Sequence, residues 1–180
     1  MIDGRLLSAL ILGAAFLVVL GLLWLGWRAK GRAQSAVPAP MPLDEAAFGE
    51  PEAAWSDVHY VATTPHDAPL ERIVVHGLAF RGRCRIELGR SGLAVRLAGR
   101  EPFLIPLSAI ASIERGTATI DRAVEPGGLT VVRWNLAEHV AGETLVDTSF
   151  RIVDPAARAD FAARVERRIV ANATAPEELP

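Results

Sequence analysis

The chain has 180 residues, a formal net charge of −2 and a single cysteine, Cys84. A length of this order has room for one domain with accessory segments. The near-neutral charge argues against a general nucleic-acid binder, which would be strongly basic. A single cysteine excludes an internal disulfide, and the sequence contains no Cys/His spacing typical of a zinc site. We therefore expect no nucleic-acid partner, no metal and no cofactor.

A long uncharged segment follows a short N-terminal tail, residues 1–5. This segment, residues 6–27, reads LLSALILGAAFLVVLGLLWLGW. As a helix it would rise about 33 Å, which is enough for a hydrocarbon core of about 30 Å. The alternatives are a buried core helix and a cleaved signal peptide, which would have a shorter apolar region followed by a small-residue cleavage site. We interpret residues 6–27 as a single transmembrane helix.

The charges that flank this segment predict its orientation. Arg28, Lys30 and Arg32 follow it directly, whereas the tail before it contains Asp3 and Arg5. The positive-inside rule then places the C-terminal side in the cytoplasm and the N-terminus outside. The sequence thus predicts a single-pass protein of the plasma (inner) membrane whose main domain is cytoplasmic.

Residues 28–56 differ in composition from the segments on either side. Prolines cluster between Pro38 and Pro51, alanine is frequent, and no apolar period persists. This composition is typical of a flexible tether. A coil of about 25 residues would span about 25–30 Å. We expect a flexible linker that keeps the following domain near the membrane.

From residue 57 onward, apolar and polar residues alternate as they do in half-buried strands. Turn-forming sequences separate the alternating segments, among them GRSG at 89–92 and GREP at 99–102. The candidate strands are residues 59–64, 79–88, 93–99, 102–107, 111–120, 129–138 and 144–154. Seven short strands at hairpin spacing predict a mainly β fold, an antiparallel barrel or sandwich.

The period changes after the last strand. Asp154 and Pro155 form a helix start, an N-cap residue followed by proline at the first helical position. Apolar residues then recur every fourth position, at Ala157, Phe161, Val165 and Ile169. This stripe predicts an amphipathic helix that caps an open end of the barrel. We expect a disordered tail at residues 172–180.

Residues 57–171, seven antiparallel strands closed by one C-terminal helix, resemble a pleckstrin-homology (PH) domain. The phrases PFLIPLSAIASI and FRIVDPAARADFAARV resemble parts of bacterial PH-like domains. The whole chain is similar to bacterial single-pass membrane proteins with a cytoplasmic PH-like domain, some of them labelled as transporter or export proteins. The resemblance implies a PH-like fold and a membrane-proximal binding role. It does not imply a phosphoinositide site, because Phe161 replaces a common tryptophan and the first hairpin loop is expected to be too short.

The segment AFRGRCRIEL, residues 79–88, sets arginines at alternate positions, so they share one face of a strand. If GRSG forms a tight hairpin with Leu88 opposite Leu93, Arg85 lies opposite Arg96 and Glu87 lies on the diagonal. The candidate contacts to an anionic surface are Arg81, Arg83, Arg85, Arg90, Arg96 and Arg100. These arginines form a solvated strand face, a contact to anionic lipid or a contact to a protein partner, and the sequence leaves the three alternatives open.

The sequence contains no catalytic motif of the GxSxG, P-loop or dinucleotide-binding type. Cys84 and Trp134 alternate in step with apolar neighbours, and we interpret both as core residues. We therefore predict a non-enzymatic interaction module at the cytoplasmic membrane face that binds a partner protein or an anionic lipid surface. The alternatives are an accessory subunit of a multi-span transporter complex and a small-molecule-binding or enzymatic β-barrel.

Overall fold

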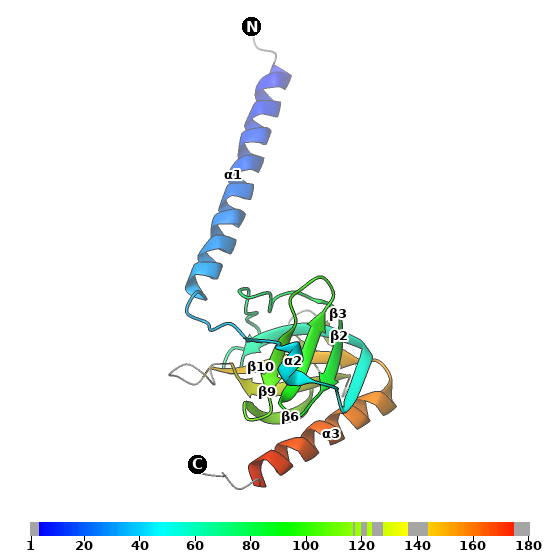
Figure 1. Cartoon of the computed structure of the whole chain (residues 1–180). Coiled ribbons are helices and arrows are strands. Elements are labelled where there is room, and N and C mark those ends of the chain that lie inside the picture. Colours follow the sequence, from blue (N-terminus) through cyan, green and yellow to red (C-terminus); the bar gives the residue numbers. More distant parts are fainter. Residues whose placement is uncertain (1–3, 117, 120–121, 124–127, 137–143, 175–180) are drawn as a thin grey trace. The chain divides into compact units, whose positions relative to one another are not determined.

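The computed structural model describes residues 4–116, 118–119, 122–123, 128–136 and 144–174 (Figure 1). In the N-terminal helix, the side chains described are those of residues 10–26, 28, 29 and 32. The chain divides into two compact units, Met1–Ala36 and Val37–Pro180. The first unit contains one helix, and the second contains every described strand.

The first unit is the helix α1 (Gly4–Ala33). Its described large apolar side chains, from Leu10 to Leu25, are 45% to 71% exposed. Ser35 ends the helix, because its backbone N–H and its Oγ both donate to the Arg32 carbonyl, at 3.1 and 2.7 Å. Among the residues described, no helix is both long and apolar enough to cross a membrane. A helix is thus observed over the predicted segment, and its membrane-spanning role stays a prediction.

The second unit is built on an antiparallel sheet of eight strands in the order β1-β5-β4-β3-β2-β10-β9-β6. The strands are β1 (Met41–Pro42), β2 (Ala53–Pro65), β3 (Gly82–Leu88), β4 (Gly92–Leu97), β5 (Phe103–Pro106), β6 (Ile110–Gly116), β9 (Leu129–Asn135) and β10 (Leu145–Ile152). A separate two-stranded ribbon consists of β7 (Ala118–Thr119) and β8 (Arg122–Ala123). Apart from the short β1, each main strand overlaps one predicted strand, so the mainly β, antiparallel prediction is confirmed. The sheet is open, with β1 and β6 at its edges, rather than closed into a barrel.

The long strand β2 connects the two halves of the sheet. Its first part, from Ala53 to Tyr60, pairs with β3, and its second part, from Val58 to Pro65, pairs with β10. A register shift interrupts each of these two ladders. Such irregularities bend a strand and increase its twist. The sheet therefore curls, and its inner face encloses one core.

The hairpin of β3 and β4 has the predicted register. Leu88 pairs with Leu93, and the apolar pairs beyond them follow in step. β4 begins at Gly92. At this residue β4 lies so close to β5 that a side chain would not fit. A Cβ atom at Gly92 would lie 2.1 Å from the carbonyl oxygen of Ile105. Any larger residue would push the two strands apart.

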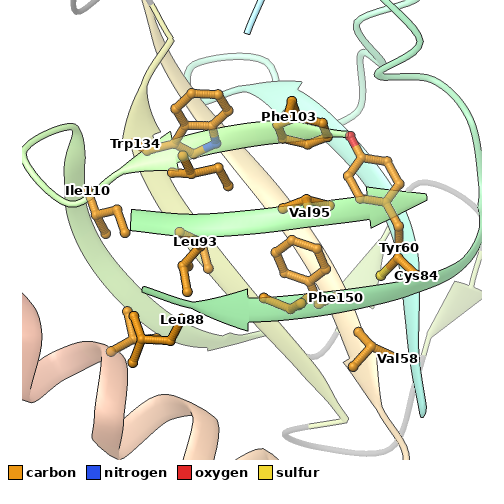
Figure 2. Packing of buried hydrophobic residues seen from close by; sticks show 14 of the residues in the cluster. Val58, Tyr60, Cys84, Leu88, Leu93, Val95, Phe103, Ile110, Trp134 and Phe150 are labelled. Carbon is orange, nitrogen blue, oxygen red and sulfur yellow. The ribbon is translucent and has the colours of Figure 1, made fainter. Parts of the chain in front are cut away.

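The core combines side chains from both halves of the sheet (Figure 2). Tyr60 meets Phe150 edge to face, with ring centroids 5.8 Å apart. Trp134 is buried as predicted, and its indole N–H donates to Thr148 Oγ1 at 2.9 Å. Thr148 Oγ1 in turn lies 2.9 Å from Thr63 Oγ1, which also bonds the Tyr60 hydroxyl. The polar atoms of this group are thus paired inside an apolar core, as buried polar groups need to be.

The C-terminal helix α3 (Pro155–Thr174) covers one end of this core. Asp154 caps it, since its carboxylate accepts from the backbone N–H groups of Ala156 and Ala157 at 3.2 and 3.1 Å. Phe161 and Val165 of the predicted stripe are fully buried. The predicted amphipathic cap is therefore confirmed. The helix continues through Thr174, into the segment expected to be a disordered tail, and residues 175–180 lie outside the described residues.

The segment expected to be a flexible linker, residues 28–56, differs from that expectation. Its first residues belong to α1, and its second half contains β1, α2 (Glu45–Phe48) and the start of β2. Phe48 is buried against Ala94 and Leu104 on the outer face of the sheet. A helix of four residues and a strand of two are too short to produce an apolar period. Only residues 34–36 thus separate α1 from the second unit, which begins at Val37.

Candidate interaction surfaces

The predicted arginine pair lies on the outer face of β3 and β4. Arg85 pairs directly with Arg96 across the hairpin, as expected. The side chain of Glu87, 8% exposed, joins them. Arg85 Nε donates to Glu87 Oε1 at 2.6 Å, and Arg96 Nε donates to Glu87 Oε2 at 2.9 Å. The carboxylate on the diagonal therefore compensates two guanidinium groups that would otherwise repel each other.

Helix α2 supplies a second carboxylate to this face. Arg96 Nη1 and Nη2 donate to Glu45 Oε1 and Oε2 at 2.5 and 2.7 Å. These hydrogen bonds to Glu45, together with those to Glu87, raise the pKa of Arg96. The same contact lowers the pKa of the Glu45 carboxylate. A segment expected to be part of the linker thus covers part of the predicted binding face and compensates the charge of Arg96.

The other four candidate arginines lie on β3 and in the loops that adjoin β3 and β4. Arg81 directly precedes β3 and Arg83 lies within it, and both are exposed. Arg90 is exposed in the turn to β4. The guanidinium carbon of Arg100 lies 5.0 Å from the centre of the Phe80 ring, a cation–π contact. Their contact with an anionic surface stays a prediction.

A cavity of about 530 Å³ opens between the β2–β3 connection and the turn from β4 to β5. Its lining comprises His76, Gly77, Leu97, Gly99, Arg100, Glu101 and Phe103. The loop of the β3–β4 hairpin, residues 89–91, is short, as expected, whereas the β2–β3 connection, residues 66–81, is long. This connection folds back onto the sheet and buries Ile73 and Leu78. Arg100 and Glu101 place charges of both signs in the lining of the cavity.

His76 is the residue at this cavity with an unusual backbone. Its φ is 55°, in the left-handed region that residues with side chains adopt infrequently. Its Nε2 lies 2.8 Å from the Val37 carbonyl oxygen, so the ring donates a hydrogen bond to the first residue of the domain. This contact connects the start of the domain to the rim of the cavity.

A second cavity, of about 380 Å³, lies between β6 and α3, which run beside each other in Figure 1. Its lining comprises Ile113, Glu114, Arg115, Thr130, Pro155, Arg158, Ala159, Ala162, Ala163 and Glu166. We call it the β6–α3 groove. This groove could not be predicted from the sequence alone. The alanines at helical spacing were a signal, but only the fold places them beside an edge strand.

Cys84 is a core residue, as predicted. It is buried, and desolvation raises the pKa of its thiol to about 12. The thiol is therefore protonated near neutral pH and is a poor nucleophile. Within the described part of the chain, no cluster of three or more His, Cys, Asp or Glu residues is arranged to hold a metal ion.

Residues 38–166, more than half of the chain, match the bacterial PH domain-like family. No curated protein matches the chain. The match starts one residue after Val37, where the second unit starts, so the family match and the fold agree that residues 41–56 belong to the domain. The chain therefore belongs to the bacterial PH domain-like family.

Proposed function

We propose that the protein is a membrane-anchored, non-catalytic interaction module that binds a partner protein through its PH-like domain. The observation that carries the proposal is α1. Its described apolar side chains are exposed around the whole helix, and residues 6–27 carry no charge. A helix that is apolar on all sides is stable in an apolar environment rather than in water. The surrounding bilayer would supply that environment.

The proposed orientation places the PH-like domain in the cytoplasm, next to the inner membrane. Arg28, Lys30 and Arg32 follow the apolar segment and would remain on the cytoplasmic side. Residues 34–36, which separate α1 from the domain, reach about 10 Å when fully extended. The domain would therefore remain within a short distance of the membrane face, where it would meet membrane proteins.

The charge pattern on the outer face of the sheet favours a protein partner over anionic lipid. An uncompensated basic group near an anionic leaflet contributes roughly 1 kcal/mol of attraction. Arg85 and Arg96 are compensated by Glu87 and Glu45, and α2 occupies part of the same face. The attraction expected from this surface is correspondingly reduced.

Carbonate extraction of membranes from cells that express the full chain tests the anchor. We expect the protein to remain in the membrane pellet at alkaline pH. A variant with Leu12→Arg and Val18→Arg should move to the supernatant, because charges at the centre of an apolar helix oppose insertion. The matched control, Leu12→Ala with Val18→Ala, should stay in the pellet. Release of the unmodified chain by carbonate would refute the proposed anchor.

Hydrogen exchange of the full chain in nanodiscs tests the choice between protein and lipid. We expect the amides of β3 and β4 to exchange at the same rate in neutral and in anionic nanodiscs. Glu45→Gln removes one counter-charge of Arg96. This variant should gain some protection in the anionic discs. Protection of the unmodified protein in anionic discs would instead favour lipid as the ligand.

A further inference from the structure

The main sheet ends in a strand with one free edge. β6 pairs with β9, and among the described residues no strand lies along its other side. In an antiparallel ladder, alternate residues direct their N–H and C=O groups to opposite sides. β6 therefore presents backbone donors and acceptors along seven residues, Ile110–Gly116. A free edge of this length readily pairs with another extended chain.

The β6–α3 groove adjoins this edge. Ile113 pairs with Val132 and Arg115 pairs with Thr130, and both partners are buried, so these side chains share the inner face of the sheet. The inner face of β6 therefore points into the groove. A strand added to the edge of β6 would direct alternate side chains into the same groove.

Three of the six α3 residues that line the groove are alanines. Ala159, Ala162 and Ala163 follow the three- and four-residue spacing of one helix face. This face is distinct from the stripe of Phe161 and Val165 that packs into the core. Alanine methyl groups leave space between the helix and the strand. The cavity of about 380 Å³ is of the size that holds side chains of a bound segment.

Thr130 is an independent indication of a ligand in this groove. It lines the groove and is 2% exposed, and its Oγ1 has no hydrogen-bond partner. A buried hydroxyl without a partner is unfavourable, and such groups are rare in folded proteins. The hydroxyl can donate to or accept from a polar group that enters the groove.

The charges of the groove restrict the ligand further. Glu114 is already paired, since Arg133 Nη1 donates to its Oε1 at 2.7 Å. The remaining charged residues of the lining are Arg115, Arg158 and Glu166, which together are positive. An acidic residue in the ligand would complement this lining.

We propose that the β6–α3 groove binds an extended segment of a partner protein, which adds to β6 as a further strand. The segment places small apolar side chains against the alanines of α3 and an acidic residue beside Arg115 and Arg158. Backbone hydrogen bonds supply affinity in this binding mode, and the alternate side chains supply selectivity. This inference rests on the proposed function, because it names the partner chemistry of the interaction module.

Peptide selection on the full chain in detergent micelles tests the inference. The probe is a library of ten-residue peptides with alanine, valine or threonine at alternate positions and serine or aspartate at the others. A second library of the same composition carries two central prolines, which prevent strand pairing. We expect at least about tenfold enrichment of the first library, since about 1.4 kcal/mol corresponds to a factor of ten in binding. N-methylation of alternate amides in a selected peptide should abolish its binding.

Variants locate the binding site. Ala159→Phe fills the groove at an exposed position and should weaken binding of a selected peptide by about tenfold or more. The matched control is Ala171→Phe, the same change at an exposed position of α3 outside the groove. It should leave binding unchanged. Arg115→Glu should weaken binding of peptides that contain aspartate and not of those that lack it. Thermal unfolding of each variant checks that the fold is retained.

Three results would overturn the inference: equal enrichment of the two libraries, binding that survives N-methylation, or equal effects of Ala159→Phe and Ala171→Phe. Carbonate extraction of the same chain is independent of the groove. A chain that stays in washed membranes but enriches no extended peptide would overturn the groove proposal alone. A chain that binds peptides in the predicted way but is released by carbonate would overturn the anchor alone.

Discussion

The two edges of the main sheet differ in how they are covered. At one edge β5 pairs with β1, and the adjoining outer face is covered by α2, where Phe48 lies on Ala94 and Leu104. At the other edge, β6 pairs with β9 on one side, and no described strand lies along its other side, next to the β6–α3 groove. A free edge tends to pair with other chains. The residues before β2 therefore protect one edge, whereas no described strand covers the other.

Removal of the Phe48 ring at the covered edge should lower the free energy of unfolding more than any other change considered below. We expect Phe48→Ala to lower the free energy of unfolding by about 3 kcal/mol, since it leaves a cavity between α2 and the sheet. At the free edge, Ile113 is only half-buried, and Ile113→Ala should cost about 1 kcal/mol. Urea unfolding followed by circular dichroism measures both. If the two variants lost the same free energy of unfolding, the two edges would not differ in how well they are covered.

Loss of the shared carboxylate on the same outer face should have an intermediate effect. Glu87→Gln keeps the size of the side chain but removes the charge that joins Arg85 and Arg96. We expect it to lower the free energy of unfolding by about 1–2 kcal/mol, as for hydrogen bonds to charged groups. In a protein that already carries Arg85→Gln, the same change should cost less, because one of the two like charges is gone. A double-mutant cycle without coupling would argue against a shared role of Glu87.

The Glu45–Arg96 contact should have the smallest effect, and the effect should depend on pH. The hydrogen bond from Arg96 lowers the pKa of Glu45 in the folded protein. A carboxylate with a lowered pKa stabilises the folded state above its unfolded pKa, and this contribution is lost as the pH falls through the folded pKa. The stability difference between the unmodified protein and Glu45→Gln should therefore be largest above about pH 4.5 and disappear at lower pH. If the stability difference between the two proteins grew as the pH fell, the Glu45 carboxylate would not stabilise the folded state through its contact with Arg96.

The β3–β4 hairpin and α3 show how much of the fold could be predicted from sequence. The pairs Leu88–Leu93 and Arg85–Arg96 follow from alternation and a tight turn, because hairpin partners are close in the chain. The start of α3 at Asp154 is equally local. These elements were predictable because neighbouring residues alone decide them.

The candidate surfaces were less predictable. The arginines of β3 and β4 were identified correctly as one strand face, but Glu45, which neutralises Arg96, lies 51 residues away in the chain. The β6–α3 groove needs β6 at an edge, α3 beside it and the Thr130 hydroxyl between them. None of these three conditions is visible in any single segment.

Sequence alone predicts the alternating strands, the capped amphipathic helix and the uncharged apolar segment that forms α1. Each depends on periodicity or composition over a few consecutive residues, which local sterics and side-chain direction convert directly into structure. The tertiary fold places α2 over the arginine face and β6 at a free edge. Those outcomes depend on contacts between residues far apart in the chain, and such contacts form only when the whole sheet has curled around its core.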